Sequence, residues 1–214
     1  TGVLPGDRYA YELDGSGPFP DPCSRSQPDG VHGFSEVVDP WSFDWRDEQW
    51  TRPRFPDLVI YEAHIGTLTR EGTFDSAVAL FEQLVDMGIS AIELMPVAAF
   101  PGRWNWGYDG VSQFAPVEVY GGSEGLRRLV DAAHQAGLAV ILDVVYNHFG
   151  PAGNYTGLYS DGYVTDRYPT PWGQAMNFDG PGSEHTRAFF RENLRHWQHE
   201  YRIDGFRFDA THAI

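Results

Sequence analysis

The sequence predicts an α/β fold that corresponds to the first four β/α units of a (β/α)8 barrel. Four strand-like segments alternate with three helix-like segments from about residue 58 onward, an order typical of parallel sheets. The third strand-like segment is a continuous apolar run, as in strands covered on both faces. A doubly wound sheet would show the same order, but no glycine-rich phosphate loop follows the first strand. Polar residues instead follow the carboxyl ends of successive strands, where barrel enzymes place their sites.

Residues 1–50 are expected to form the tail of a β-rich domain and a linker, ahead of the half-barrel at 51–214. The stretch RYAYELDG alternates Tyr9, Tyr11 and Leu13 with polar residues and ends in an Asp-Gly turn, which predicts a half-buried strand. Residues 17–33 are rich in Pro and Gly and predict an ordered connector without helix or strand. Because one strand cannot bury its own face and four strands make only half a barrel, we expect the chain to be cut from a longer protein at both ends.

The elements of the half-barrel follow one another in a regular order. Strands are predicted at 58–65, 91–97, 138–146 and 203–210. Helices are predicted between them, at 73–88 with Thr73 as N-cap, at 123–137 with Ser123 as N-cap, and at 183–201. Gly88 and Gly137 are predicted to end the first two helices.

The composition excludes several classes of partner. The formal net charge is −15, with too few Lys and Arg to neutralise nucleic-acid phosphates or to hold an anionic membrane surface. No apolar run approaches the length of a membrane span, and no signal peptide is recognisable. The single cysteine, Cys23, excludes an internal disulfide and a cysteine metal cluster, so we expect a reducing, cytoplasmic location. Aromatic residues are 15% of the chain, which suits a sugar-binding cleft, although most are expected in the core.

The last predicted strand carries an ion pair in an apolar context. Because strand side chains alternate between faces, Arg207 and Asp209 point to one side while Phe206 and Phe208 point to the other. A carboxylate near the barrel axis is costly unless it is paired, and a neighbouring guanidinium keeps it ionised. The pair is therefore either part of a nucleophilic site or a buried ion pair that only orders the core.

The third predicted strand adds a second polar cluster, in the stretch DVVYNH at 143–148. Asp143 and Asn147 are expected on one strand face, with His148 just beyond the strand end. Three ligands of mixed type without a partner cluster are a weak metal signal. Hydrogen bonding to a polyhydroxyl ligand explains them as well, so no metal ion and no cofactor is predicted.

The motifs DVVYNH and GFRFDA, on successive strands, resemble the first two signature regions of the α-amylase superfamily of glycoside hydrolases. The resemblance covers about residues 55–214, and residues 1–50 resemble the end of the β-sandwich module that precedes the barrel in branching and debranching members. Loop 93–110 resembles both branching enzymes and the malto-oligosyltrehalose trehalohydrolases. Segments 165–183 and 209–214 resemble the trehalohydrolases specifically, because debranching enzymes lack the first of these segments and branching enzymes usually lack the Asn of DVVYNH.

The resemblance implies roles for seven residues. Asp209 matches the catalytic nucleophile, and Arg207 matches the residue that orients and charges it. The others match positions around the sugar: His148 hydrogen-bonds it, Tyr108 stacks on it, His212 contacts substrate, and Asp143 and Asn147 brace the site. The alternative interpretation of Tyr108 is that its ring is buried in the core beneath a glycine-rich loop. Asn147 is a calcium ligand in many amylases, but no calcium is expected here.

The implied activity belongs to the full-length protein, which would cleave the α-1,4 bond next to the terminal trehalose of malto-oligosyltrehalose and release trehalose for trehalose biosynthesis. Retaining glycosidases need a second carboxyl group as acid/base, which the family takes as a Glu from the fifth strand, so the 214-residue chain alone is expected to be inactive. Glu62 and Glu93 are interpreted as structural. The alternatives are a branching or debranching enzyme, which also acts on an α-glucan, and a non-catalytic glucan-binding protein. The sequence predicts no oligomeric state.

Overall fold

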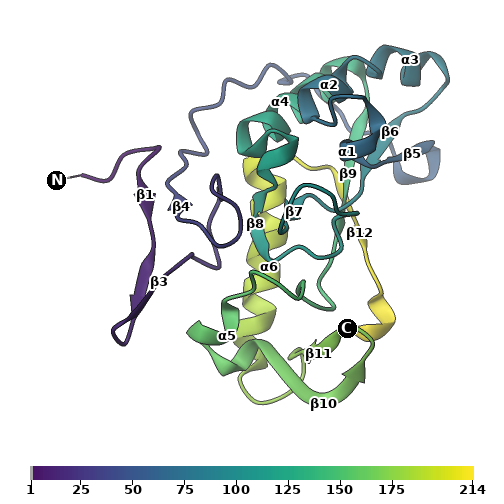
Figure 1. Cartoon of the computed structure of the whole chain (residues 1–214). Helices are drawn as coiled ribbons and strands as arrows, with labels where there is room; N and C mark the ends of the chain where they lie inside the picture. Colours follow the sequence, from purple (N-terminus) through teal and green to yellow (C-terminus); the bar gives the residue numbers. More distant parts are fainter. Residues whose placement is uncertain (1) are drawn as a thin grey trace.

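A four-stranded parallel sheet forms the centre of the computed structural model, which describes residues 2–214 (Figure 1). Its strands are β5 (Ile60–Ala63), β6 (Ala91–Leu94), β9 (Ala139–Val144) and β12 (Gly205–Phe208), in the spatial order β12-β9-β6-β5. All neighbouring pairs are parallel. The α/β fold is thus confirmed, and each predicted strand is present but shorter than its predicted range.

Two long helices follow the prediction to within one residue, and the first predicted helix does not. The long helices are α4 (Gly122–Ala136) and α6 (Ser183–Glu200). The prediction of one helix at 73–88 is wrong, because the chain forms α2 (Phe74–Val78) and α3 (Phe81–Asp86). Between them the Leu80 amide donates to the Ala77 carbonyl, a tight three-residue turn that interrupts the helical ladder.

The predicted caps of the helices agree with the structure except at the start of α4. The Thr73 hydroxyl accepts a hydrogen bond from the Ser76 amide at 3.2 Å, which confirms Thr73 as an N-cap. Gly88 and Gly137 both have φ of +85°, which allows the chain to leave the helix there. Ser123 as N-cap of α4 is wrong, because Gly121 holds that position with φ of +117°. The Ser123 hydroxyl instead donates to the Arg25 carbonyl at 2.7 Å.

Shorter elements surround the sheet and the long helices. They are β1 (Arg8–Tyr9), β2 (Tyr11–Leu13), β3 (Ser16–Phe19), β4 (Ser35–Glu36), α1 (Ile65–Leu68), β7 (Ala98–Ala99), β8 (Ser112–Pro116), α5 (Thr156–Tyr159), β10 (Val164–Thr170) and β11 (Gly173–Met176), with 3-10 turns η1 (Phe55–Asp57), η2 (Glu118–Tyr120), η3 (Asp161–Tyr163) and η4 (Thr211–Ala213). The pairs β7–β8 and β10–β11 are antiparallel ribbons in the loops after β6 and β9.

The amino-terminal segment contains more strand than predicted. β2 and β3 form an antiparallel hairpin around Asp14 and Gly15, so the prediction that 17–33 contains no strand is wrong for residues 17–19. Pro18 is compatible with this ribbon because a two-stranded sheet has edges where no backbone donor is needed. β1 pairs with β4, and both lie to one side of the sheet and helices in Figure 1.

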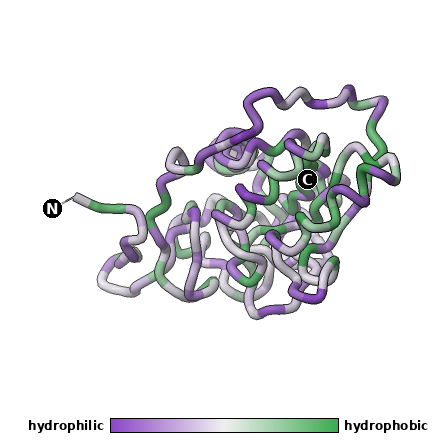
Figure 2. Tube along the Cα trace, turned by 90° about the horizontal axis from the view of Figure 1, so that it is seen from above, coloured by the Kyte–Doolittle hydropathy of each residue, from purple (hydrophilic) through white to green (hydrophobic). Residues whose placement is uncertain are grey.

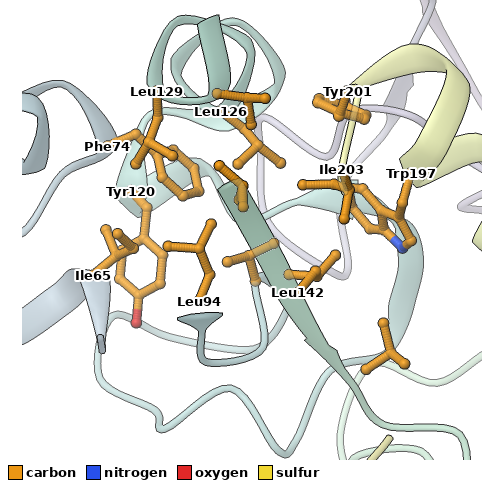
Figure 3. Close-up of a cluster of buried hydrophobic side chains, with 14 of the residues drawn as sticks. Ile65, Phe74, Leu94, Tyr120, Leu126, Leu129, Leu142, Trp197, Tyr201 and Ile203 are labelled. Atoms are coloured by element: carbon orange, nitrogen blue, oxygen red, sulfur yellow. The ribbon is translucent and has the colours of Figure 1, made fainter. Parts of the chain in front are cut away.

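The main core lies between the sheet and the helices that cover it. Phe74 of α2, Leu126 and Leu129 of α4, Leu142 of β9 and Trp197 of α6 point toward one another and are at most 2% exposed (Figure 3). All six residues of β9 are buried, as its apolar run predicts. β5, at the edge of the sheet, is largely exposed.

Hydropathy follows the same division between packed interior and surface. Figure 2 shows apolar stretches gathered in the body of the molecule, while hydrophilic stretches run mostly around its outside. None of the helices within residues 2–214 is long and apolar enough to cross a membrane.

Candidate active site

An ion network joins the carboxyl ends of β9 and β12. Asp143 and Arg207 lie opposite each other in the parallel register of these strands. One guanidinium nitrogen, Nη1 of Arg207, donates to both Asp143 oxygens at 3.0 and 2.9 Å and to Oδ1 of Asp209 at 2.8 Å. Arg207 and Asp209 thus share a face, as strand alternation predicts.

Asp143 is the buried anchor of the network. Its side chain is fully enclosed, and the Tyr108 hydroxyl donates to its Oδ2 at 2.8 Å. Burial raises the pKa of Asp143, and the hydrogen bonds from Tyr108 and Arg207 oppose that effect. Burial would lower the pKa of Arg207, but Asp143 and Asp209 raise it overall, so the guanidinium remains charged. A permanent positive charge therefore lies beside the Asp209 carboxylate.

The Tyr108 side chain is positioned by a loop that approaches its neighbours very closely. Gly107 has φ of +98°, and a Cβ there would collide with the Pro96 carbonyl. A Cβ at Gly150 would collide with the Asp109 carbonyl in the same way. Glycine is required at both positions because the backbones touch. These contacts fix the loop over the ends of β6 and β9.

His148 lies just beyond β9 and is 6% exposed. Its ring stacks on Trp172 of the β10–β11 ribbon, with centroids 5.4 Å apart and planes inclined by 15°. Burial lowers the pKa of His148, although the Tyr108 backbone and the charge of Asp209 oppose this. The imidazole is thus neutral at pH 7, with an Nδ1 that has no hydrogen-bond partner within residues 2–214. A neutral ring of this kind can donate to or accept from a hydroxyl group.

The structure brings four of the seven predicted residues into direct contact and places the others differently. Tyr108, Asp143, Arg207 and Asp209 form the hydrogen-bonded network. Asn147 is completely buried, and neither atom of its amide has a partner among the described residues. His212 is exposed in η4, a turn that begins directly after Ala210. Ala210 has φ of +42°.

Glu62 and Glu93 are paired residues of β5 and β6, and β6 in turn pairs with β9. Because Glu93 lies opposite Ile141, two residues before Asp143, it shares the sheet face of the network. Burial raises the pKa of Glu93, and the charges of Glu62 and Asp143 add to that effect. Both carboxylates lie within their strands and make no hydrogen bond to the Asp209 network among the described residues.

Sequence reasoning missed His64 and Trp172. His64 directly follows β5, and its Nε2 lies 2.7 Å from the Asn105 carbonyl and 3.1 Å from the Tyr120 hydroxyl. Its place at a strand end was the available signal, the same one that identified His148. Trp172 lies in the loop at 165–183, where no regular spacing connects it with His148.

The chain matches the model of a known protein family. Residues 19–161 match the family model "Alpha amylase, catalytic domain", which is more than half of the chain. The chain belongs to the α-amylase family. The resemblance inferred from the two strand motifs is thereby confirmed.

Individual relatives of this α-amylase family chain agree with the assignment. It is 53% identical over 212 residues to a malto-oligosyltrehalose trehalohydrolase of Saccharolobus solfataricus, covering 99% of the chain and 37% of the relative. It is 49% identical over 209 residues to the enzyme of the same name from Deinococcus radiodurans, covering 98% and 34%. The crystal structure of a putative α-amylase from Salmonella typhimurium superposes with a TM-score of 0.95 at 44% identity, covering 100% of this chain and 36% of that one. The chain thus spans about a third of the length of these relatives.

Proposed function

We propose that the full-length protein is a retaining glycoside hydrolase that releases trehalose from malto-oligosyltrehalose. One observation carries the proposal: Arg207 joins the buried Asp143 and the accessible Asp209 at the ends of two adjacent strands. The Asp209 side chain keeps 19% of its surface exposed, whereas Asp143 keeps none. Of the two carboxylates, only Asp209 can reach a substrate.

In this proposal Asp209 attacks the anomeric carbon of the sugar and forms a covalent glycosyl-enzyme, which water then hydrolyses. Arg207 orients the carboxylate and places a positive charge 2.8 Å from it, and Asp143 fixes Arg207 from behind. Tyr108 presents its ring to the sugar while its hydroxyl is fixed on Asp143. The neutral His148 imidazole offers a hydrogen-bonding nitrogen to the sugar, Asn147 braces the strand end, and the exposed His212 contacts substrate.

The acid/base carboxyl of the mechanism is proposed to come from another part of the full-length protein. The second carboxyl of a retaining enzyme lies ~5 Å from the nucleophile. Glu62 and Glu93 lie level with Gly205 in the strand register, four residues before Asp209. Residues 51–214 would then be the amino-terminal half of the catalytic barrel and residues 1–50 the end of a β-sandwich module with its linker. On this basis the 214-residue chain by itself is inactive. The unpaired, exposed Cys23 suits a reducing compartment such as the cytoplasm.

The trehalose specificity of the proposal rests on the relatives that share nearly the whole chain. Trp172, from the segment that resembles the trehalohydrolases, stacks on His148, so this segment reaches the proposed sugar site. A branching or debranching enzyme would share the Asp209 chemistry but would transfer a glucan chain or cut a branch instead.

The test compares the full-length protein with its Asp209→Asn variant on malto-oligosyltrehalose. The amide keeps the shape of the carboxylate but is a poor nucleophile, so hydrolysis should nearly vanish while oligosaccharide binding remains measurable. Residual turnover above a few per cent would exclude Asp209 as nucleophile. Chromatography of the parent's products should show trehalose, and a branched or debranched glucan in its place would refute the trehalohydrolase assignment.

A further inference from the structure

His64 follows the first strand of the sheet, yet its side chain contacts the loop after the second strand. It comes directly after β5 and is the N-cap residue of α1. Its Nε2 lies 2.7 Å from the backbone carbonyl of Asn105, three residues before Tyr108. Because a carbonyl oxygen only accepts hydrogen bonds, the imidazole donates from Nε2. This hydrogen bond ties the end of β5 to the loop that carries Tyr108.

The His64 ring is itself fixed by its neighbours. Its Nδ1 lies 3.0 Å from the Thr67 hydroxyl. Tyr120 is 3% exposed and packs edge-on against the imidazole, with ring centroids 6.0 Å apart. The Tyr120 hydroxyl lies at the edge of the core cluster (Figure 3) and donates to the same Asn105 carbonyl at 3.4 Å. A Cβ at Gly66 would lie 2.9 Å from the Tyr120 ring and 3.0 Å from the His64 ring, so the imidazole has little room to rotate.

The Asn105 side chain holds the residues on either side of Tyr108. Its Nδ2 donates to Asp109 Oδ2 at 2.7 Å, and its Oδ1 accepts a hydrogen bond from the Gly107 amide at 2.7 Å. Tyr108 lies between these two residues, and its hydroxyl donates to the buried Asp143 at 2.8 Å. The position of the Asn105 backbone therefore determines where Tyr108 lies relative to the ion network.

We propose that His64 is a positioning residue for the reaction at Asp209 and that it acts on Tyr108 through Asn105. The inference rests on the proposed function, in which Tyr108 presents its ring to the sugar. Without the Nε2 donor, the Asn105 carbonyl keeps only the longer hydrogen bond from Tyr120 among the described residues. The loop can then shift, and a displacement of about 1 Å at a group that orients the substrate can cost about 10²-fold in rate.

Two amide substitutions in the full-length protein separate the roles of the two ring nitrogens of His64. In His64→Gln the side-chain nitrogen can take the place of Nε2 and restore the donor, whereas in His64→Asn the shorter amide reaches only the place of Nδ1, beside Thr67. His64→Asn should lower kcat for malto-oligosyltrehalose by about 10-fold with little change in KM, because orientation at the reacting centre acts on the chemical step. His64→Gln should keep at least about a third of the parental kcat, since it restores the hydrogen bond to Asn105. An equal kcat in the two variants would overturn the inference.

A double-substitution cycle distinguishes positioning of Tyr108 from a general effect on the structure. In a Tyr108→Ala background, His64→Asn should cause no further loss of kcat, because the group that His64 positions is absent. A further loss of about 10-fold in that background would make the two effects independent and would overturn the inference. If the parent hydrolyses malto-oligosyltrehalose and His64→Asn matches it, only this inference fails. If the parent does not hydrolyse malto-oligosyltrehalose, the proposed function fails and the inference fails with it.

Discussion

The contact between Arg25 and Glu200 should contribute strongly to holding the amino-terminal segment against the barrel helices. Arg25 donates from Nε and Nη2 to the Glu200 carboxylate at 2.6 to 3.0 Å, in a forked pair. Glu200 is at the end of α6 with its side chain 8% exposed, and His196 Nδ1 lies 3.2 Å from the same carboxylate. Replacing Arg25 with Met removes the charge and both donors while preserving most of the apolar stem.

The size of the effect follows from the pKa of Glu200. Burial alone would raise this pKa, but His196 and Arg25 lower it from 4.5 to about 2. A difference of that size corresponds to about 3 kcal/mol of stability. His196 accounts for part of this stabilisation, and solvent screening reduces the part that belongs to Arg25, whose side chain is 40% exposed. We therefore expect Arg25→Met to cost about 1 kcal/mol at pH 7.

The stability difference between the parent and Arg25→Met should depend on pH in one direction. The folded-state pKa of Glu200 is depressed, so its stabilisation is complete above about pH 4.5 and is lost as the pH falls through about 2. Urea unfolding of the full-length protein should therefore show a smaller difference between parent and variant at pH 3 than at pH 7. Arg54→Met is the control, because Arg54 is 83% exposed in its pair with Asp57 and should change stability by less than about 0.5 kcal/mol. An Arg25→Met variant as stable as Arg54→Met at pH 7, or an equal loss at both pH values, would refute this reasoning.

Three further predictions concern other parts of the chain. His134 lies between two carboxylates, with Nδ1 2.6 Å from Asp47 and Nε2 2.9 Å from Asp204; burial lowers its pKa but the hydrogen bonds to Asp204 and Asp47 raise it overall. The stabilisation by charged His134 should be complete below about pH 6.5 and should be lost as the pH rises through the higher pKa of the folded state. His134→Gln should therefore flatten the pH dependence of the thermal midpoint above about pH 6.5. An unchanged pH profile would contradict the ion pairs of His134 with Asp47 and Asp204. Gly107→Ala in the full-length protein should reduce kcat/KM by at least about 10-fold, because the added Cβ would displace the loop that positions Tyr108. Gly2→Ala is the control, since a Cβ there meets no neighbouring atom. An unchanged kcat/KM in Gly107→Ala would contradict the close contact between Gly107 and the Pro96 carbonyl. Trp197→Ala should lower stability by about 3–5 kcal/mol because the side chain is 2% exposed within the core, and a loss below 1 kcal/mol in urea unfolding would contradict the packing.

Features that depend on local periodicity could be predicted from the sequence. The apolar run of β9 predicted a strand covered on both faces, and Thr73 predicted a helix start. Strand alternation predicted the shared face of Arg207 and Asp209, because a period of two requires only the local backbone. The contact of Arg207 with Asp143 required the parallel register of β12 on β9 as well.

Features that depend on tertiary contacts could not be predicted in the same way. The break between α2 and α3 lies in a sequence with good helical spacing, so packing determines it. Ser123 is a favourable N-cap residue, but its hydroxyl donates to the distant Arg25 carbonyl instead. The stacking of Trp172 on His148 likewise joins loops that no spacing rule connects.

The central claim is that Asp209 forms the covalent bond to the sugar. A fluorinated glucosyl substrate that slows hydrolysis of the glycosyl-enzyme should inactivate the full-length protein, and mass spectrometry of its proteolytic peptides would locate the attached sugar. The account predicts one fluorohexosyl adduct, on the peptide that contains Asp209, and no adduct in Asp209→Asn. An adduct on Glu62, Glu93 or any other carboxylate would contradict it.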